Sequence, residues 1–506
     1  MLASLRSAAV FGVDAFPVLI EVDVAFGLPH FTMVGLPDAT VRESRDRVRS
    51  AIRNSGFEFP HHRITVNLAP ADVRKAGSSF DLPIALGLLA ASGPLSRHTV
   101  EDTVVLGELS LDGGINAIRG VLPIAVAARR LGLKRLLLPP QNAAEACAVK
   151  GLEVCTVRAL PDAVAALNDP ETAVLTSPSP DTTFSPTTAD GDGDLADVRG
   201  QLVPRRALEI AAAGGHNLLL VGPPGAGKTM LARRLPTILP PLTFDESLEC
   251  TAIHSVAGLL PLGQGLLTER PFRAPHHTIS NVALVGGGAV PRPGEISLAH
   301  HGVLFLDEMP EFDRRVLEVL RQPLEEGRVT IARAARTAVF PARFLLVAAM
   351  NPCPCGYAGH EKKACHCTPV QVDRYCGRLS GPLRDRIDLT VTVPAVPAGV
   401  VADEIPGESS AVVRQRVVAA RQAHHRRCGD DGPGVNAAMR RRDVGTWCRP
   451  DAEGRAMLYR AAERFGLSAR ACDRVLKVAR TLADLTASSD VRAEHVAEAL
   501  QYRVVE

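Results

Sequence analysis

Two short segments carry the residue types that hydrolysis of a nucleoside triphosphate requires. The first, residues 222–229, reads GPPGAGKT and matches the pattern G-x-x-x-x-G-K-[ST]. Its glycines let backbone N–H groups close around a phosphate, Lys228 reaches the β- and γ-phosphates, and Thr229 holds Mg²⁺ through its hydroxyl. The residues expected to contact the nucleotide are Gly222, Pro223, Pro224, Gly225, Ala226, Gly227, Lys228 and Thr229.

The second segment is an apolar run, residues 303–306, that ends in Asp307 and Glu308. As a buried strand it delivers both carboxylates at its C-terminal end, with Asp307 near the Mg²⁺ ion and Glu308 placed to polarise the attacking water. A Gly-rich loop alone could be an ordinary turn, but an apolar strand, residues 218–221, precedes this one and residues 230–232 continue it as a helix. The two segments together predict a Mg²⁺-dependent ATPase that binds ATP.

A third group of reactive residues is a set of four cysteines in the pattern C-x-C…C-x-C. Its members are Cys353, Cys355, Cys365 and Cys367. Four thiolates on one short loop supply the ligands of a structural, tetrahedral Zn²⁺ site. The spacing of one residue within each pair is less usual than two, so His360 or His366 is an alternative ligand, and a set of free thiols is the other interpretation.

The whole-chain properties narrow the class of protein. A length of 506 residues predicts two to four domains, and 57 basic against 55 acidic residues mean that any nucleic-acid surface must come from local clustering. The longest apolar run, residues 82–91, contains a proline and is too short to span a membrane, and residues 1–13 lack the features of a signal peptide. The 11 cysteines, four of them bunched, suit a reducing compartment, so we expect a cytoplasmic protein with no membrane partner.

Residues 1–168 read as an α/β domain. Alternating apolar residues predict a strand at residues 18–24, with residues 31–34 as its partner. Asp38 is the expected N-cap of a helix that runs to about Ser55. The other expected elements are a strand at 64–68, a helix at 82–91, a hairpin at 104–115, a helix at 121–131 and a strand at 136–138.

The rest of the chain divides into three parts. Residues 169–194, rich in Pro, Ser, Thr and Asp, read as a flexible acidic linker. The nucleotide-binding core follows at residues 195–399, and residues 400–506 read as helical. The helices expected in this last part, after an Arg-rich one, are residues 452–465, 469–485 and 493–502.

The core contains two elements that are expected to project from it. The separation of 79 positions between Lys228 and Asp307 (307 − 228 = 79) is too long for one helix and one strand, so an insertion is expected, with a loop at residues 286–288. A second candidate is a hairpin between residues 327 and 340, with arginines around its turn. These arginines are Arg328, Arg333 and Arg336.

Many segments in the same order resemble one family. They include NLAPADVRKAGSSFDLPIALGLLAASG, ADVRGQ, PFRAPHHT, PGEISLAHHGVLFLDEMPEF, NPCPCG, SGPLRDRIDL and LSARACDRVLKVARTLADL. The chain resembles the magnesium-chelatase-like AAA+ proteins of the ComM/YifB family over nearly its whole length. The resemblance implies an N-terminal α/β domain of the Lon-protease (ribosomal S5 domain 2-like) fold, an AAA+ P-loop core with a parallel sheet, and a C-terminal helical lid. It also implies a ring hexamer and DNA branch migration during recombination of incoming DNA.

The resemblance assigns roles to three further residues. Asn351 matches the sensor asparagine that positions water, with a strand-end turn as the alternative. Arg386 matches the family's arginine and is our choice for a finger that acts on the neighbouring subunit's nucleotide. A salt bridge to Asp385 or Asp388 is the alternative for Arg386.

Arg470 matches the lid-borne sensor arginine. It shares a helical face with Arg474 and Lys477, so a solvated basic stripe is the alternative. Arg384 departs from the family pattern, which often has an apolar residue there, and no role is assigned to it.

The Lon-like domain is expected to be non-proteolytic. KAGSS places Ser79 at the nucleophile's position, but a Lon-type peptidase also needs a lysine to activate it. Leu122 stands about where that lysine would fall, and no lysine occurs from residue 76 to 133. We therefore interpret Ser79 as the N-cap of the helix that begins near Asp81.

Three classes of motor are compatible with these residues. The first is a translocase on DNA, branched, single- or double-stranded, gripping phosphates without base specificity as a homo-hexamer. The second is a chelatase motor that drives metal insertion with partner subunits, and the third is a protein-remodelling ATPase. The Lon-like domain and the cysteine cluster favour the first.

Overall fold

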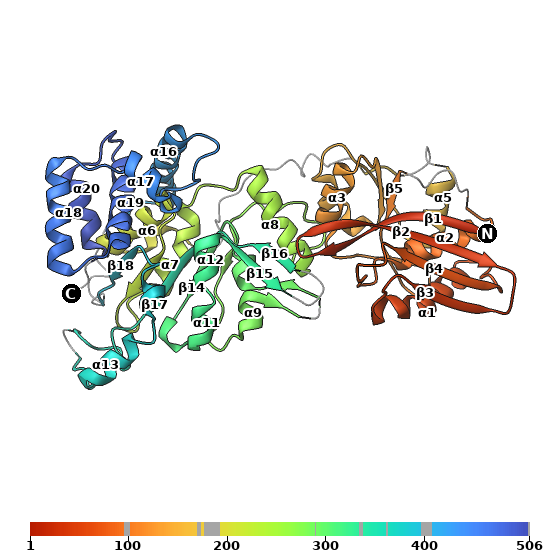
Figure 1. Ribbon diagram of the computed structural model, residues 1–506, viewed down its shortest axis with the longest axis horizontal. Helices are drawn as coiled ribbons and strands as arrows, with labels where there is room; N and C mark the ends of the chain where they lie inside the picture. The colour runs from red at the N-terminus through yellow and green to blue at the C-terminus, as the bar shows by residue number, and fades with distance from the viewer. Residues whose placement is uncertain are drawn as a thin grey trace.

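The computed structural model describes residues 1–95, 102–169, 174–176, 193–288, 290–332, 337–360, 363–395 and 407–503. The molecule is elongated, with the N-terminal domain at one end, the nucleotide-binding core in the middle and the helical lid at the other end (Figure 1). Within the described residues, no helix combines the length and the apolar character that crossing a membrane requires.

The N-terminal domain is built on a seven-stranded mixed sheet in the order β3-β4-β2-β1-β5-β8-β9. Its strands are β1 (Leu2–Phe11), β2 (Asp14–Ala25), β3 (His30–Val34), β4 (Arg63–Ala69), β5 (Thr103–Val105), β8 (Arg135–Leu138) and β9 (Glu153–Thr156). Its helices are α1 (Ala39–Asn54), α2 (Asp81–Ser92), α3 (Val121–Arg130), α4 (Ala143–Cys147) and α5 (Leu160–Asn168). As predicted, Asp38 caps α1, because its carboxylate accepts the N–H of Val41 at 2.8 Å.

Two predictions about local structure in this domain are wrong. Residues 31–34 do not pair with the strand at 18–24: β3 pairs in parallel with β4, and β2 lies between β4 and β1. The sequence reading missed β1, which takes the hairpin position beside β2. Ser79 is not a cap: Phe80 holds the N-cap position of α2 without a side-chain hydrogen bond, and the carbonyl of Ser79 accepts the N–H of Gly107.

Two further segments differ from the expectation. The expected hairpin at 104–115 is divided, because β5 joins the large sheet while β6 (Glu108–Leu109) and β7 (Ile115–Asn116) form a small hairpin. Most of the predicted linker lies outside the described residues. Its residues 174–176 do not form a free linker, since they hydrogen-bond along β9 through Thr156 N to Val174 O (3.2 Å) and Thr176 N to Val154 O (2.8 Å).

The core contains a five-stranded, all-parallel sheet in the order β11-β14-β17-β10-β18. Its strands are β10 (Leu218–Val221), β11 (Phe272–Arg273), β14 (Val303–Leu306), β17 (Leu345–Met350) and β18 (Leu389–Thr392). The helices of the core are α6 (Leu202–Gly214), α7 (Lys228–Ile238), α8 (Phe244–Ala257), α9 (Asn281–Val285), α10 (Glu295–Leu298), α11 (Arg314–Glu318), α12 (Arg321–Glu326), α13 (Pro369–Cys376) and α14 (Gly381–Arg384). The three central strands β14, β17 and β10 end at one edge of the sheet, which is where parallel sheets bind ligands.

The two inserted hairpins are β12 (Gly286–Gly287) with β13 (Arg292–Pro293), and β15 (Arg328–Ala332) with β16 (Thr337–Pro341). Arg328 is not near a turn as predicted, because it pairs with Pro341 at the base of its hairpin, and Arg333 and Arg336 lie outside the described residues. The strands of this second hairpin are packed against the body: Gly12, at the tip of the β1–β2 hairpin, lies against Ala338 and Val339. The N-terminal domain and the core therefore meet at β15–β16, as Figure 1 shows.

The lid consists of α16 (Ser410–Cys428), α17 (Arg441–Trp447), α18 (Ala452–Phe465), α19 (Ala469–Leu485) and α20 (Ala493–Gln501). It shares one hydrophobic cluster with the nucleotide-binding core. In this cluster Val475 and Leu482 of α19 pack together with Leu208 of α6 and Leu218 of β10. Buried apolar surface therefore holds the lid to the core.

Candidate nucleotide-binding site

The loop between β10 and α7, residues 222–227, has the geometry of a phosphate-binding loop. Gly222 cannot be replaced by a larger residue, since a Cβ there would lie 2.2 Å from the carbonyl oxygen of Val393. Lys228, the first residue of α7, curls back over this loop and donates hydrogen bonds from Nζ to the carbonyl oxygens of Gly222 (2.6 Å) and Pro223 (2.9 Å). Burial lowers the pKa of Lys228, and the charges of the two carboxylates after β14 act in the opposite direction.

The two predicted Mg²⁺ ligands lie together. The hydroxyl of Thr229 donates a hydrogen bond of 2.7 Å to Oδ2 of Asp307, so two hard oxygen donors from α7 and β14 meet. Glu308 follows Asp307 but points elsewhere, with Oε2 3.9 Å from Nδ1 of His277. Glu308 holds a left-handed backbone conformation (φ +50°), and this turn separates the two neighbouring carboxylates.

Asn351, at the end of β17, lies beside the lysine of the loop. Its Oδ1 accepts a hydrogen bond of 3.0 Å from Nζ of Lys228. The backbone N–H of Asn351 hydrogen-bonds to the hydroxyl of Tyr375, whose pKa burial raises to about 12. Asn351 therefore belongs to the site. Its side chain is hydrogen-bonded to Lys228, which follows the phosphate-binding loop, and its backbone N–H is hydrogen-bonded to Tyr375 of α13.

The four cysteines converge as a metal site requires. Their Sγ atoms all lie within 4.8 Å of one another. The separations are 3.3 Å for Cys353–Cys355, 3.6 Å for Cys353–Cys365 and 3.6 Å for Cys355–Cys365. Zn–S bonds of about 2.3 Å in a tetrahedron place sulfur atoms about 3.8 Å apart, close to these values. Neither alternative ligand, His360 or His366, belongs to the group.

The surroundings of the cysteine loop favour the thiolate of Cys355, and the loop contacts the nucleotide site. Backbone N–H groups of Tyr357 and His366 hydrogen-bond to Cys355 and lower the pKa of its thiol to about 6. Gly356, in the same loop, lies against Pro224 of the phosphate-binding loop: a Cβ at Gly356 would be 2.6 Å from Cδ of Pro224. An ion bound by the cysteines would therefore stiffen a wall of the nucleotide site.

Arg386 lies apart from its own nucleotide site. It forms an ion pair with Glu325 of α12 and donates to the carbonyl of Pro382 at 2.5 Å. Neither alternative salt bridge of Arg386 is formed: Asp388 pairs with Arg474 of α19 at 3.2 Å, and Asp385 lies 3.5 Å from Arg503. Arg384 is exposed and hydrogen-bonds to the carbonyl of Cys376.

Arg470 is exposed on the first turn of α19 and has no ion pair with any residue that the structure describes. The alternative of a solvated basic stripe does not hold for its neighbours. Arg474 is bound to Asp388, and Lys477, which burial gives a lowered pKa, donates to the carbonyl of Ala437 at 2.9 Å. Of these three basic side chains on α19, only that of Arg470 remains available to a ligand.

A second group with metal-binding side chains is formed by Glu249, His300 and His301. Both imidazole Nε2 atoms lie 2.8 Å from Oε2 of Glu249. Nδ1 of His300 accepts the backbone N–H of Arg343 at 2.9 Å, so Nε2 carries the proton of the neutral ring and donates it to Glu249. A protonated nitrogen cannot bind a metal, and burial lowers the pKa of His300 to about 4. The group is a hydrogen-bonded brace for the turn that leads into β14.

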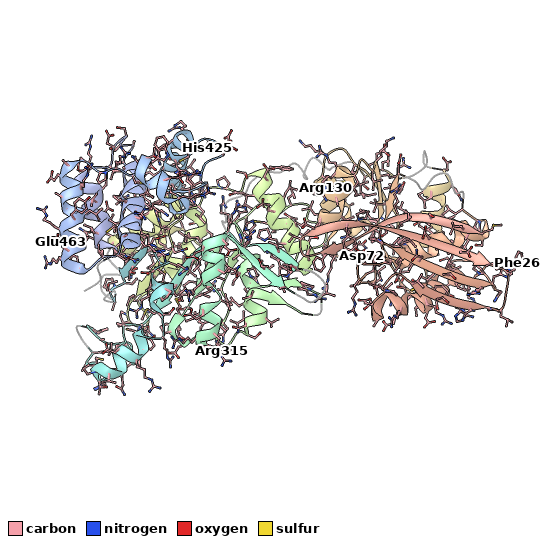
Figure 2. The ribbon with its side chains drawn as sticks, in the orientation of Figure 1. Phe26, Asp72, Arg130, Arg315, His425 and Glu463 are labelled. Atoms are coloured by element: carbon pink, nitrogen blue, oxygen red, sulfur yellow. The ribbon has the colours of Figure 1, made fainter. Side chains whose placement is uncertain are left out.

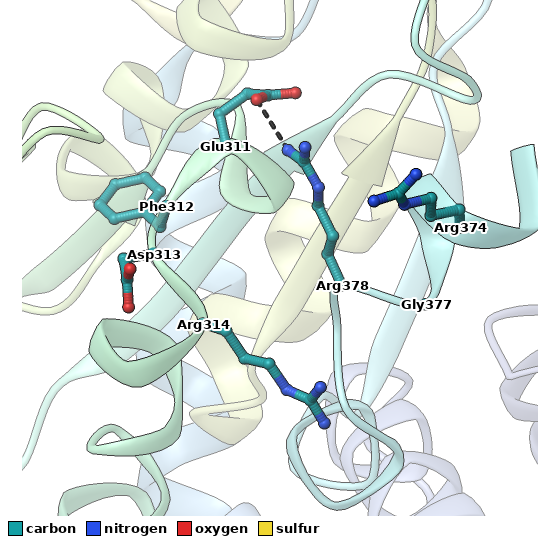
Figure 3. Close-up of a pocket in the computed structure, with 7 residues that line it drawn as sticks. All are labelled: Glu311, Phe312, Asp313, Arg314, Arg374, Gly377 and Arg378. Carbon is teal, nitrogen blue, oxygen red and sulfur yellow. Dashed lines mark hydrogen bonds and ion pairs between the residues drawn. The ribbon is translucent and has the colours of Figure 1, made fainter. Parts of the chain in front are cut away.

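A cavity of about 640 Å³ lies beside the carboxylate segment (Figure 3). Its lining residues are Glu311, Phe312, Asp313, Arg314, Arg374, Gly377 and Arg378. One wall follows Asp307 and Glu308 in the chain, and the other is formed by the end of α13 and the two residues after it. Arg378 crosses between them, donating to Oε2 of Glu311 at 2.8 Å. No residue of the phosphate-binding loop lines this cavity, so it is a neighbour of the nucleotide site and not the site itself.

Sequence reasoning missed three residues that the fold brings to the site. Gln201 donates from Nε2 to the carbonyl of Ala226 at 2.8 Å, His277 faces Glu308, and Tyr375 holds Asn351. The first two stand in segments, ADVRGQ and PFRAPHHT, that the sequence analysis used only for the family resemblance. These two segments are rich in polar and charged residues, which could have marked Gln201 and His277 as candidates. Their contacts with the site could not be predicted, because they depend on long-range packing.

Comparisons with known proteins agree with this architecture. Residues 194–401 match the family model described as magnesium chelatase, subunit ChlI. Residues 20–142 match the model for subunit ChlI of Mg-chelatase, and residues 407–503 match the model for the ChlI C-terminal region. Within the N-terminal domain, the Lon protease of Chloroflexus aurantiacus is 32% identical over 133 residues, which are 25% of this chain and 16% of that protein.

Full-length relatives complete the identification. The protein YifB of Salmonella typhimurium is 46% identical over 507 residues, covering 100% of this chain and 97% of its own length. The competence protein ComM of Haemophilus influenzae is 45% identical, covering 100% and 98%. The fold and the site define an AAA+ P-loop protein of the magnesium-chelatase type with a Lon-protease-like N-terminal domain. The chain belongs to the ComM/YifB family, which confirms the resemblance.

Proposed function

We propose that the chain is a Mg²⁺-dependent ATPase that acts as a homo-hexameric ring and moves on branched DNA, as a branch-migration helicase or translocase in homologous recombination. The observation that carries the proposal is the nucleotide site: Lys228, Thr229, Asp307 and Asn351 come from three adjacent strand ends and are joined by hydrogen bonds of 2.7 and 3.0 Å. A full-length relative is named a competence protein, which supports a role in handling DNA.

The residues of the site divide the chemistry among them. The loop N–H groups and Lys228 bind the phosphates, Thr229 and Asp307 fit the ligand set of Mg²⁺, and Glu308 polarises the attacking water. The ion neutralises charge on the phosphates when it is bound. Arg386, supplied by the neighbouring subunit, and Arg470, supplied by the lid, would add positive charge at the γ-phosphate.

We also propose a structural Zn²⁺ ion on Cys353, Cys355, Cys365 and Cys367. Four converging sulfurs and the backbone N–H groups directed at them support this assignment. The ion would brace the loop that contacts Pro224, so its role is to stiffen the site and not to take part in hydrolysis.

DNA contacts would be independent of sequence. The β12–β13 and β15–β16 hairpins are the elements that we assign to the pore of the ring, where arginines would bind phosphates. ATP, Mg²⁺ and DNA meet in the cytoplasm, which is the compartment that we assign to the chain.

The second candidate is a chelatase motor. The three matches to subunit ChlI favour it, because that subunit's name gives a metal-insertion complex as the setting for this ATPase fold. A protein-remodelling ATPase is the third candidate, and the similarity to Lon protease favours it. ATP turnover by a chelatase motor would be stimulated by partner subunits, whereas turnover by a protein-remodelling ATPase would be stimulated by unfolded protein.

The test is ATP hydrolysis by the purified chain without DNA and with single-stranded DNA, duplex or a four-way junction. Strong stimulation, greatest with the junction and lost in Lys228→Ala, would support the DNA motor. Turnover that is indifferent to every DNA but stimulated by unfolded protein or by a chelatase partner would replace it with one of the other two candidates.

A further inference from the structure

The exposed face of α1 carries a stripe of four arginines. Arg42, Arg45, Arg49 and Arg53 follow one another at intervals of three, four and four residues, so they share one face of this 16-residue helix. All four are exposed, whereas the opposite face of α1 is packed into the core of the domain. At 1.5 Å per residue, the stripe is about 16 Å long.

The charges of this stripe are not neutralised by ion pairs within the part of the chain that the structure describes. None of the four arginines forms an ion pair with a residue that the structure describes, whereas Arg47, off the stripe, binds Asp81 at 2.7 Å. The acidic residues of α1 are Glu43, which lies 4.0 Å from Arg47, and Asp46. Five arginines against two carboxylates leave the helix with a formal charge of +3 (5 − 2).

Aromatic rings hold two of these arginines toward the edge of the sheet. The guanidinium of Arg45 lies over the ring of Phe31 of β3 at 5.9 Å, and that of Arg49 lies over the ring of Phe59 at 5.8 Å. The stripe therefore runs beside β3 toward the start of β4, and its side chains are partly ordered before any ligand binds.

Large apolar side chains are exposed at the same end of the domain. In the turn between β2 and β3, Phe26 is 96% and Leu28 is 88% exposed. The ring of Phe26 lies edge-on to His62 at 5.2 Å, next to Arg63, the first residue of β4. Figure 2 shows Phe26 at the extreme end of the molecule. An exposed aromatic residue among cationic side chains indicates a binding surface.

We propose that this surface, formed by the four arginines of α1 with Phe26 and Leu28, binds single-stranded nucleic acid. The arginines neutralise successive phosphates, and Phe26 stacks on an unpaired base. The inference rests on the proposed function, since a motor that remodels branched DNA exposes single strands. It adds a role for the N-terminal domain, which binds a strand outside the AAA+ pore.

Two observations favour a single strand over other polyanionic partners. A protruding ring stacks directly on an unpaired base, whereas a duplex must first be kinked and partly unstacked before Phe26 could enter it. An amphipathic helix binds a membrane through its apolar face, and the apolar face of α1 is buried in the domain core, so α1 itself could not insert. The exposed apolar side chains at this end of the domain, Phe26 and Leu28 with Met1 and Leu2 beside the end of β2, would remain for insertion.

The experiment measures binding of a fluorescent oligothymidylate to the full-length chain by anisotropy at several salt concentrations. Replacing the four arginines by alanine should weaken binding at least 10-fold at 0.1 M salt and reduce the salt slope by about 3, or about 0.7 for each phosphate contact. Phe26→Ala should weaken binding roughly 10-fold without changing the slope, because stacking involves no ion release.

The matched control replaces Arg129 and Arg130, two exposed arginines of the same domain, by alanine. Figure 2 shows Arg130 at the opposite end of the domain from Phe26, so this variant should bind as the wild type does. ATP hydrolysis without DNA should be unchanged in all three variants, which verifies that they are folded.

Three outcomes would overturn the inference, and they are distinct. If the α1 and Phe26 variants bind the oligonucleotide normally while DNA still stimulates the ATPase, the inference fails and the proposed function stands. If the wild type neither binds DNA nor is stimulated by it, both fail. If the variants keep DNA binding but lose binding to vesicles of anionic phospholipid, the surface is a membrane contact.

Discussion

Glu308 holds a backbone conformation that side-chain-bearing residues rarely adopt, with φ of +50°. This conformation costs about 1–2 kcal/mol, so the surroundings must hold it in place. It directs the side chain toward His277 while Asp307 binds Thr229, and two adjacent carboxylates thereby receive different surroundings. We infer that the strained residue divides metal binding and water activation between two neighbours.

Glu308→Gln should therefore bind ATP with near-normal affinity but hydrolyse it about 100- to 10,000-fold more slowly, because the amide cannot accept a proton. Single-turnover hydrolysis and a fluorescent-nucleotide titration measure the two quantities. Glu311→Gln, a change at an exposed carboxylate that lines the neighbouring cavity, is the control and should keep turnover within a few-fold. Near-normal turnover in Glu308→Gln would show that another group serves as the base.

At the scale of elements, the cysteine loop joins the end of β17 to the phosphate-binding loop. Cys353→Ser should remove about one Zn²⁺ ion per chain and slow ATP turnover about 10- to 100-fold, because Pro224 and Asn351 lose the wall that fixes them. Zinc released by a thiol-reactive mercurial reagent and steady-state ATP hydrolysis are the measurements. Cys147→Ser, at a half-buried cysteine of the N-terminal domain, should change neither. Retention of full turnover without zinc would separate the loop from catalysis.

Asp388 joins three elements: it lies after α14, accepts the backbone N–H of Asn217 before β10 at 3.2 Å, and pairs with Arg474 of the lid. Burial alone would raise its pKa, but the contact with His216 and the charge of Arg474 outweigh burial and lower the pKa from 3.8 to about 2. The folded protein thus binds this proton less readily than the unfolded chain. The resulting stabilisation is present above pH 3.8 and is lost as the pH falls toward 2.

Asp388→Asn should therefore lower the free energy of unfolding of the core and lid by about 2 kcal/mol at pH 7 and pH 5, and by less at pH 3.5. Urea unfolding at the three pH values measures the difference. Asp385→Asn is the control, since Asp385 is partly exposed and lies 3.5 Å from Arg503. A deficit that stays constant down to pH 3.5 would mean that Asp388 contributes through its shape and not through its charge.

The elements also show what sequence could predict. Asp38 caps α1 as expected, because a cap depends on residues three apart, and the P-loop is found for the same reason. The parallel pairing of β3 with β4 was missed, because it depends on packing across the domain. The order of Lon-like domain, parallel-sheet core and helical lid followed from the family resemblance. His277 and Tyr375 could not be placed, since long-range packing alone brings them to the site.

For the whole molecule, the N-terminal domain and the core form a continuous structure. Glu145 of α4 accepts hydrogen bonds from Ser255 of α8 and, at 2.7 Å, from the N–H of Leu122 in α3. The side chain of Ser255 also accepts the N–H of Gly120 at 3.0 Å. Gly12 also packs against β16. These contacts join the Lon-like domain to α8, which precedes β14 in the chain, and to β16, which follows it. A movement of the nucleotide site in a ring would therefore carry the N-terminal domain, and the DNA-binding surface proposed on it, with it.

The proposed ring is tested by complementation between two inactive variants. Arg386→Ala keeps its own nucleotide site but lacks the finger, and Glu308→Gln keeps the finger but lacks the base. Each alone should hydrolyse ATP at least 100-fold more slowly than the wild type. In equal mixtures, a site is competent when its subunit is Arg386→Ala and the neighbour that supplies the finger is Glu308→Gln. Random assembly makes this true for about one site in four, so the mixture should recover up to about a quarter of wild-type turnover.

Arg384→Ala is the matched control for this experiment, because Arg384 is two residues away and hydrogen-bonds to a carbonyl of its own chain. Arg384→Ala should be active alone. When it is mixed with Glu308→Gln, ATP turnover should not exceed the average of the two separate proteins. Recovery in the mixture of the two inactive variants can arise only if Arg386 acts across a subunit boundary, since neither chain holds both groups. Absence of recovery, with mixed rings demonstrated by differently tagged subunits, would place Arg386 in its observed ion pair with Glu325 as a structural residue and leave the finger to another arginine.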